Sequence, residues 1–557
     1  MSLILLSLSH EADVFAKKPT AQGTKRKLDL PQSAENAYKL AKLDANNHSR
    51  SNGQTAQVED EEDDDEVAGP ARPEESEEPE DDEEGRFFGG GIGNGTADIL
   101  DFMDEQDEDQ SAPEKIDAAW VRKMALNFEK RISKNSELRA KFEDQPQKFM
   151  ASEADLDADI KALSILSEHS GLYEEFAKLG CVNSLVGLLS HENADIAIDA
   201  IEIISELTAE DVEAEQDQWD SLVNAMLEAD VLDLLAQNFE RFEEKNESDR
   251  NGVYHSLSVL ENFASRPSIN ERIAKTSLLS WILGRIKVKE SPVGQNKQYA
   301  AEILAIFLQG SEASQKRLID LDGVDVLMQL LSSYRKRDPP KGSEEEEYVE
   351  NLFDCLTCIV DTYEGKEKFL EGEGVELSLI MLREGKMSRP RALRLLDHAL
   401  GGRTGLIVCE KLVEAAGLKT VFGMFSKKQD NQTIEHLLGI FATLLRLLPA
   451  NSAERIRTLA KFVEKDYEKI ERIVSHRRDY VSRLRLVEDE IDQEKTSMSA
   501  EDAREMTDEW FSRRLDAGLF CLQTIDVVLA WLIAEDDGAR RKIVALLADR
   551  DESLGNK

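Results

Sequence analysis

The chain has 557 residues, 41% of them hydrophobic, and its 69 Lys and Arg against 112 Asp and Glu give a formal net charge of −43. A chain of this length can hold several domains or one long array of repeats. Because phosphate backbones and anionic membrane surfaces attract Lys and Arg, this charge argues against nucleic acid and membrane as general partners. It favours basic partners.

Five cysteines are scattered along the chain, a usage typical of reduced thiols and not of a disulfide framework. The apolar N-terminal stretch MSLILLSLS is short and lacks a preceding Lys or Arg, so it does not fit a secretory signal. No apolar run approaches the roughly 18 to 20 residues of a membrane span. We therefore expect a soluble, intracellular protein.

Residues 1–114 differ in composition from the rest, and we expect them to form a disordered head. The run from Glu59 to Glu84 holds 17 acidic residues and one Arg, and charge this dense opposes burial of a core. Its role stays open between solubility and competition for basic surfaces. Two short basic clusters precede it, and because importins bind such clusters, we interpret them as a nuclear localisation signal; the alternative is a solvated patch. The clusters comprise Lys17, Lys18, Lys25, Arg26 and Lys27.

From residue 115 onward, apolar residues recur with helical spacing, and strand patterns are nearly absent. The stretch LDGVDVLMQLL, Leu321–Leu331, is one of about six similar helix starts. Successive copies lie 49, 47, 46, 51 and 43 residues apart, the period of armadillo and HEAT repeats. A small residue at each start permits a sharp turn from the preceding helix. The copies begin at Cys181, Asp230, Ser277, Gly323, Gly374 and Gly417.

The fold class predicted from this pattern is all-α: a right-handed armadillo/HEAT-type superhelical solenoid. We expect an N-terminal helical cap over 115–170, armadillo-type repeats over 171–450 and a C-terminal helical cap over 451–557. A heptad-like seam, seven apolar residues from Val463 to Ile491, predicts a long coiled-coil-like helix. Whether it packs on a neighbouring helix or on a second copy stays open. The apolar stretch Trp510–Ile533 predicts a single closing helix.

Signals for catalysis or metal binding are weak. Cys355 and Cys358 form a C-x-x-C inside a helical pattern, with no second pair at ligand spacing, so we interpret them as core residues. His398 follows Asp397, yet adjacent residues on a helix point apart. We expect no enzyme, no cofactor and no metal site.

Acidic side chains on the last helix of each repeat are the better candidates for function. In an armadillo superhelix this helix lines the concave groove, where carboxylates can pair with Lys and Arg of an extended peptide. The alternative is that they form only the solvated side of each helix. The candidates are Glu202, Glu206, Glu261, Asn262, Asp354, Asp361 and Asp397.

Several stretches together resemble the beta-catenin-like protein (nuclear-associated protein) family of armadillo-repeat splicing factors. The resemblance runs in order through most of the chain beyond residue 115. It is carried by Gly23–Arg26 (GTKR), Asn127–Arg131 (NFEKR), Leu138–Phe142 (LRAKF), Pro146–Met150 (PQKFM), Glu350–Asp354 (ENLFD), Phe369–Gly374 (FLEGEG), Leu396–Ala399 (LDHA) and Arg513–Phe520 (RRLDAGLF).

The resemblance implies a nuclear, non-catalytic scaffold associated with the spliceosomal NineTeen complex. It also implies binding to basic, nuclear-signal-like segments of splicing proteins, with an importin carrying the protein into the nucleus. The alternative is a transport receptor or chaperone for basic cargo. Against a receptor of the importin-α kind, only Asn262 resembles its repeated Trp and Asn array. A homo-oligomer stays open.

Overall fold

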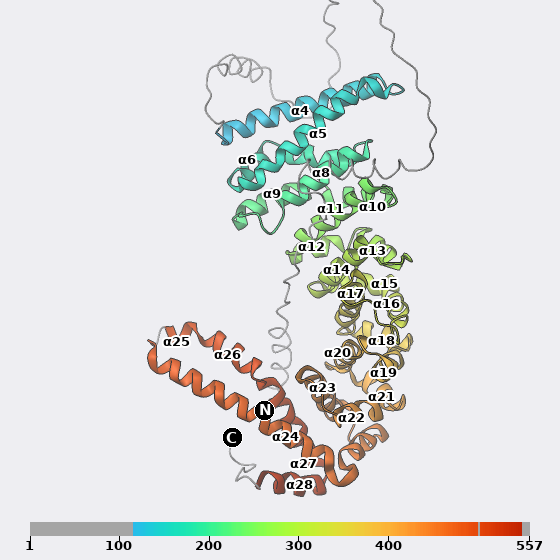
Figure 1. Ribbon diagram of the computed structural model, residues 1–557, viewed down its shortest axis with the longest axis vertical. Coiled ribbons are helices and arrows are strands. Elements are labelled where there is room, and N and C mark those ends of the chain that lie inside the picture. Colours follow the sequence, from blue (N-terminus) through green and yellow to red (C-terminus); the bar gives the residue numbers. More distant parts are fainter. Residues whose placement is uncertain (1–114, 500–501, 549–557) are drawn as a thin grey trace, which may run out of the picture. The chain divides into compact units, whose positions relative to one another are not determined.

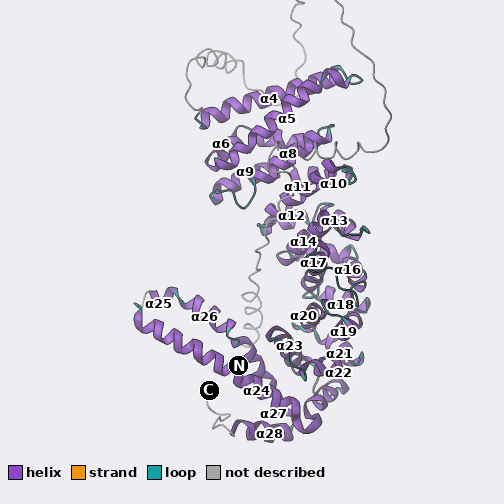
Figure 2. Cartoon of the chain, in the orientation of Figure 1, coloured by secondary structure: helices purple, strands orange, loops and turns teal. Residues whose placement is uncertain are grey.

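The computed structural model describes residues 115–499 and 502–548, which lie within the second of two compact units, Ser111–Lys557 (Figure 1). In these two ranges the regular structure is entirely helical, as the uniform purple of Figure 2 shows. The predicted all-α class is therefore confirmed. The two basic clusters and the acidic run of residues 1–114 lie outside the described residues.

Each repeat consists of three helices, which identifies it as the armadillo type, since HEAT repeats have two. The first helices are α6 Tyr173–Lys178, α9 Gln216–Glu228, α12 Pro267–Ile273, α15 Glu312–Asp320, α18 Tyr363–Glu371 and α21 Leu406–Glu414. The second helices are α7 Cys181–Gly187, α10 Val231–Arg241, α13 Leu278–Lys287, α16 Gly323–Ser332, α19 Gly374–Glu384 and α22 Gly417–Phe425. The third helices are α8 Ala194–Leu207, α11 Glu247–Ala264, α14 Gln295–Gln309, α17 Glu344–Ile359, α20 Ser388–Leu400 and α23 Asn431–Leu447.

The third helices pack side by side in chain order, and we call this row the third-helix ladder. Neighbours in the ladder are parallel: α8 contacts α11 through the residue pairs Asp195–Ser248, Glu202–His255 and Ser205–Ser258, whose numbers rise together. The ladder continues at both ends into helices of the predicted caps. These are α5 Met150–Ala162, which packs on α8, and α27 Leu519–Glu535, which packs on α23.

The junction between the first and second helices explains the recurring small residue. The residue just before α10, α16, α19 and α22 is left-handed, with φ between 55° and 60°, and none of the four is a glycine. α10 begins with Val231, but the glycine that begins each of the other three helices is needed for space, because a Cβ at Gly374 would meet the Phe369 ring at 2.2 Å and one at Gly417 would meet Leu412 at 2.4 Å. The recurring glycine thus marks the place where the first and second helices of a repeat approach each other closely.

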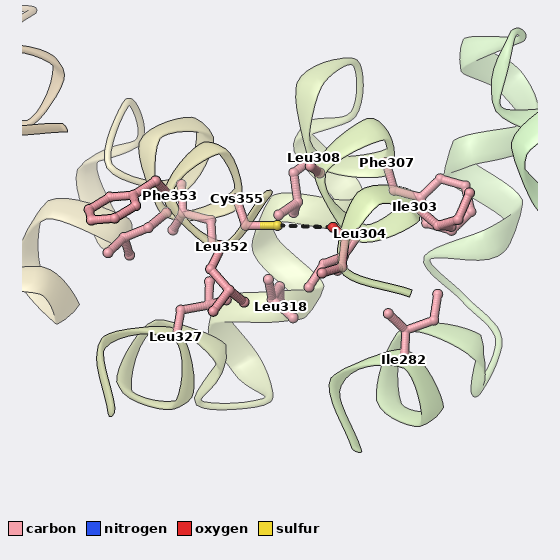
Figure 3. Close-up of a cluster of buried hydrophobic side chains, with 14 of the residues drawn as sticks. Ile282, Ile303, Leu304, Phe307, Leu308, Leu318, Leu327, Leu352, Phe353 and Cys355 are labelled. Atoms are coloured by element: carbon pink, nitrogen blue, oxygen red, sulfur yellow. Dashed lines mark hydrogen bonds between the residues drawn. The ribbon is translucent and has the colours of Figure 1, made fainter. Parts of the chain in front are cut away.

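Apolar side chains from all three helices of a repeat meet those of the next repeat (Figure 3). In one such layer, Leu304 and Leu308 of α14 lie among Leu318 of α15, Leu327 of α16 and Leu352 of α17, all fully buried. A repeat cannot bury its apolar faces alone, so stacking supplies most of its stability.

Helices outside the repeats flank the array. Before it come α4 Ala118–Lys141 and, besides α5, the short 3-10 segments Pro146–Lys148, Leu163–Glu168 and Ser170–Leu172; a fourth, Leu188–Ser190, follows α7. After it come α24 Ala453–Ser497, α25 Asp502–Glu505, α26 Thr507–Asp516, α27 and α28 Asp537–Ala548.

The C-terminal helices depart from the expected continuous ones. The span α24 is interrupted at Glu464–Tyr467, where three consecutive residues are left-handed, so it is two helices. The expectation of one helix over Trp510–Ile533 is wrong: α26 and α27 are separate and bent by 60°, with Gly518 at φ 97° between them. A continuous apolar run hid this turn, because hydrophobicity alone does not mark a change of direction.

The heptad-like seam of α24 packs within the chain. Its buried residues include Ile470, Val474 and Ile491, and the helix contacts α26, α27 and α28. Two charged residues also fall on this seam, Arg477 and Glu488, and both have partners there: Arg477 bonds Asp526 at 2.6 Å, and Arg514 bonds Glu488 at 2.7 Å. Among the described residues no single helix is long and apolar enough to cross a membrane; the bent pair α26–α27 meets that test only in combination.

Candidate functional site

All seven candidate residues lie on or directly after helices of the third-helix ladder, and all are at least partly exposed. Glu202 and Glu206 are on α8, Glu261 and Asn262 on α11, Asp354 on α17, Asp361 just after α17, and Asp397 on α20. The apolar faces of the same helices point into the core, so these polar residues share the opposite, solvent-facing side of the ladder.

On the N-terminal half of the ladder, the candidates connect neighbouring helices. Glu202 lies 3.8 Å from His255 on α11, and Glu261 accepts a hydrogen bond from Tyr299 on α14. Asn262 donates from its amide nitrogen to the Ser205 carbonyl and to the Thr208 hydroxyl, both at 3.1 Å. Asn262 therefore secures the C-terminal end of α8, and its amide nitrogen is occupied within the chain.

Glu206 differs from these neighbours. Its side chain is exposed, and its carboxylate makes no hydrogen bond or ion pair with the described residues. Its charge acts on His255 of α11, but a ligand can bind it without breaking a hydrogen bond or ion pair.

On the C-terminal half of the ladder, each candidate carboxylate faces a basic side chain of the next helix. Asp354 accepts from Arg394 at 2.9 Å, Asp361 lies 3.2 Å from Nδ1 of His398, and Asp397 lies 3.0 Å from Nδ1 of His436. These partners come from α20 and α23, 37 to 40 residues further along the chain. The negative charge of this half is therefore largely matched by the protein itself.

Three further residues belong to the site, although sequence reasoning missed them. Asp157 and Lys161 of α5 form an ion pair, and Lys161 also lies 3.5 Å from Asp199 of α8. Asp199 precedes Glu202 by three residues and Glu206 by seven, the spacing that places all three on one helix face. That spacing was a usable signal for Asp199.

Burial and mutual repulsion shift the protonation of this cluster. Desolvation, together with the hydrogen bond to Asp157, raises the pKa of Asp199 to about 7. The same contact lowers the pKa of Asp157, so the two carboxylates share a proton near neutral pH. Burial also raises the pKa of Glu202 and lowers that of His255. His255 is thus biased toward its neutral form and neutralises Glu202 little.

The two halves of the ladder consequently differ in charge. Around α5, α8 and α11 the carboxylates outnumber the basic groups, although Lys161 faces Asp157 and Asp199, and Arg131 and Arg139 of α4 pair with other carboxylates of α5. From α17 to α23, arginines and histidines offset the acids, including Arg391, which pairs with Glu350. The N-terminal half is the part of the ladder suited to holding additional positive charge.

Cys355 of the C-x-x-C pair is a buried core residue and not a reactive or metal-binding one. Cys355 is fully buried, and its thiol donates to the Ala301 carbonyl at 3.7 Å (Figure 3). Burial raises the pKa of this thiol well above its usual value, which opposes formation of the thiolate that reactive cysteines need. Within residues 115–499 and 502–548, no group of three or more His, Cys, Asp or Glu is arranged to hold a metal ion.

The family model described as "Catenin-beta-like, Arm-motif containing nuclear" matches residues 97–556. The chain belongs to this catenin-beta-like family. A curated family relative, the beta-catenin-like protein 1 homolog of Schizosaccharomyces pombe, is 40% identical over 467 residues, 84% of this chain and 81% of the relative. Beta-catenin-like protein 1 of Homo sapiens is 38% identical, over 79% of this chain and 80% of the relative.

Membership of the catenin-beta-like family agrees with the three-helix repeats and makes the protein an armadillo-repeat scaffold of a family described as nuclear. Among solved structures, a designed armadillo repeat protein matches 47% of this chain and 99% of its own, at 14% identity and a TM-score of 0.36.

Proposed function

We propose that the protein is a non-catalytic nuclear adaptor of pre-mRNA splicing, associated with the NineTeen complex, which binds basic, nuclear-signal-like segments of partner proteins along its third-helix ladder. The observation that carries the peptide-binding part is the acidic surface of α5, α8 and α11, with Glu206 exposed and unpaired. Membership of a nuclear armadillo family supports the scaffold part.

The N-terminal half of the ladder is the preferred position for the peptide. There a Lys or Arg side chain would meet Glu206 directly and would favour ionised Asp199 and Glu202, whose pKa values are raised in the free protein. Charge-assisted hydrogen bonds to carboxylates are about twice as strong as neutral ones. On the C-terminal half a ligand would first have to displace Arg394 or compete with His436.

A binding measurement tests the peptide-binding part. The double variant Glu202→Lys, Glu206→Lys should weaken binding of a fluorescent Lys/Arg-rich peptide at least tenfold, while the melting temperature changes little, since such partly exposed charges contribute little to folding. Its matched control is Glu312→Lys, Asp320→Lys, on the exposed surface of α15, which changes the net charge equally. Equal affinities of the two variants would contradict the proposed site.

The splicing part is tested separately by affinity purification of the tagged protein from nuclear extract. Recovery of NineTeen-complex components supports the adaptor. Recovery of importin-β with assorted basic cargo, and without splicing proteins, would favour the alternative transport receptor.

A further inference from the structure

The loops that precede the third helices form a basic edge on this strongly acidic protein. The edge begins with the loop before α14 and continues through the loops before α17, α20 and α23: residues 288–294, 333–343, 385–387 and 426–430. These loops contain eight Lys and Arg against three acidic residues, and all eight are exposed. The basic residues are Lys289, Arg335, Lys336, Arg337, Lys341, Lys386, Lys427 and Lys428.

The opposite ends of the same four helices show that this charge is not a general property of the loops. The loops that follow α14, α17, α20 and α23 are residues 310–311, 360–362, 401–405 and 448–452. They contain a single basic residue, Arg403, and a single acidic one, Asp361. Basic residues are therefore concentrated at one end of the ladder.

The parallel packing of the third helices brings these loops into one row. Lys336 of the second loop forms an ion pair at 3.0 Å with Glu384, the last residue before the third loop. Asp338 also accepts a hydrogen bond at 3.1 Å from the backbone N–H of Met387 in that third loop. The second and third loops are thus physically joined, and the first and fourth precede helices that pack on either side.

Most of the basic side chains on the edge form no ion pair with the described residues. Lys336 pairs with Glu384, and Arg337 pairs with Glu345 in the acidic first turn of α17, Glu344–Glu347. The other six side chains make no ion pair with the residues that the structure describes. In a protein with a net charge of −43, positive charge reduces self-repulsion wherever it lies on the surface, so folding does not require six unpaired basic side chains to be gathered in one row, and their clustering points to an external anionic ligand.

We propose that this basic edge binds an extended, acidic polypeptide segment of a partner protein. Packed helices lie about 8 to 10 Å apart, so four loops span roughly 24 to 30 Å. An extended chain rises about 3.3 Å per residue, so a segment of about eight to ten residues covers the edge. Carboxylates of such a segment can pair with the unpaired side chains while its backbone follows the row.

Two features of the edge favour an acidic polypeptide over single-stranded nucleic acid. Nucleic-acid surfaces of this kind combine basic side chains with exposed aromatic rings on which bases stack. The aromatic residue within the edge, Tyr334, is only 7% exposed, and the Arg337 guanidinium covers its ring at 5.6 Å. Three of the loops also contain an acidic residue, Glu290, Asp338 and Asp430, which would repel a continuous polyphosphate, whereas a polypeptide can place an uncharged or basic side chain opposite each of them.

The inference does not depend on the proposed function, because the basic edge and the acidic surface of α5, α8 and α11 are different surfaces. Its test uses the full chain and a fluorescent ten-residue peptide of alternating Glu and Asp. The edge variant carries Arg335→Glu, Lys341→Glu, Lys386→Glu and Lys427→Glu, all at exposed residues without ion pairs. The control variant carries Lys275→Glu, Lys316→Glu, Arg403→Glu and Lys419→Glu, also at exposed residues and with the same change in net charge.

We expect the edge variant to bind the acidic peptide at least tenfold more weakly than the wild type, and the control variant to change the affinity less than about threefold. Circular dichroism melting of both variants establishes that they fold. Equal loss in both variants, or no binding of the acidic peptide by the wild type, would overturn the proposal. Binding of a ten-nucleotide RNA that depends on the edge, without binding of the peptide, would assign the edge to nucleic acid instead.

Discussion

Gly323, the first residue of α16, lies directly against Leu318 of α15: a Cβ at residue 323 would stand 2.5 Å from Leu318 Cγ and 2.7 Å from the Leu318 carbonyl oxygen. The backbone oxygen cannot rotate away, so an added methyl group must push the two helices apart. We expect Gly323→Ala to lower the free energy of unfolding by about 1 to 3 kcal/mol, the usual cost of overpacking. Urea unfolding followed by circular dichroism measures this.

Gly284 supplies the matched control. It lies on α13, and a Cβ at residue 284 would have no neighbouring heavy atom within 4 Å, so Gly284→Ala adds the same methyl group in open space. Alanine is the better helix former by about 0.5 to 1 kcal/mol, and we expect this variant to be as stable as the wild type or more so. Similar losses in both variants would mean that close approach of the helices does not explain the recurring glycine.

The sequence allowed the repeats to be located but not the geometry of their junctions. A glycine or other small residue recurs at the start of the second helix, and spacing alone found it. The left-handed conformation, however, falls one residue earlier, on Asp322, Glu373 and Ala416. These three residues share no chemical feature that marks a left-handed backbone, because the conformation is imposed by packing of the helices on both sides.

The sequence predicted on which helices the candidate carboxylates lie, but it did not predict which basic side chains they pair with. Helical periodicity placed Asp354 and Asp397 on the solvent-facing side of the ladder. Their partners Arg394 and His436 lie in the next repeat, about 40 residues away, and only the packed register of neighbouring helices brings them opposite each other. A carboxylate without a partner on its own helix can therefore pair with a basic side chain of the neighbouring helix.

The pair Asp397–His436 should make stability depend on pH. Burial lowers the pKa of His436, but the hydrogen bond and charge of Asp397 outweigh it, and the net pKa is raised above its ordinary value of 6.5. A raised pKa in the folded state contributes stability that is fully present below pH 6.5 and disappears as pH rises through the folded value. We expect Asp397→Asn to cost about 1 kcal/mol more at pH 6 than at pH 8.

Two measurements separate this effect from a general loss of packing. Nuclear magnetic resonance titration should show the pKa of His436 lower in Asp397→Asn than in the wild type. Urea unfolding at pH 6 and pH 8 should show the larger loss at pH 6. A loss of equal size at both pH values would indicate that the pair contributes through shape and not through charge.

Asp199 should also make stability fall as pH rises, but here the ionised form of the group is the destabilising one. Its pKa is raised from 3.8 to about 7, so between these values the folded protein retains a proton that the unfolded chain has released. Stability therefore falls as pH rises from about 4 to about 7. Because the group is partly exposed, solvent screening limits the effect. We expect the stability of Asp199→Asn relative to the wild type to increase by about 1 kcal/mol between pH 5 and pH 8.

Melting curves at pH 5 and pH 8 provide the measurement for Asp199. Asp233→Asn is the control, since Asp233 is exposed on α10 and its substitution removes the same charge. A wild-type and an Asp199→Asn protein with parallel pH profiles would show that the carboxylate pair does not retain the proton.

Arg455 should be the residue on which attachment of the C-terminal helices depends most. It is only 1% exposed; its Nε bonds Glu535 of α27 at 3.0 Å, and its Nη1 bonds the carbonyl oxygens of Leu444 and Leu448 at 3.2 and 3.4 Å. Removing one partner of a buried ion pair typically costs about 3 to 5 kcal/mol, since the other charge is left uncompensated. We expect a cost of that size for Arg455→Met, measured by urea unfolding.

The neighbouring Arg457 is exposed on the same helix, so Arg457→Met is the control and should change stability by less than about 0.5 kcal/mol. Replacing both partners, Arg455→Met with Glu535→Leu, removes the uncompensated charge and should recover part of the loss. Recovery would assign the cost to the unpaired carboxylate of Glu535. If the double variant is instead as unstable as the sum of its single variants, the contacts of Arg455 with the α23 carbonyls hold the C-terminal helices in place, and the ion pair is secondary.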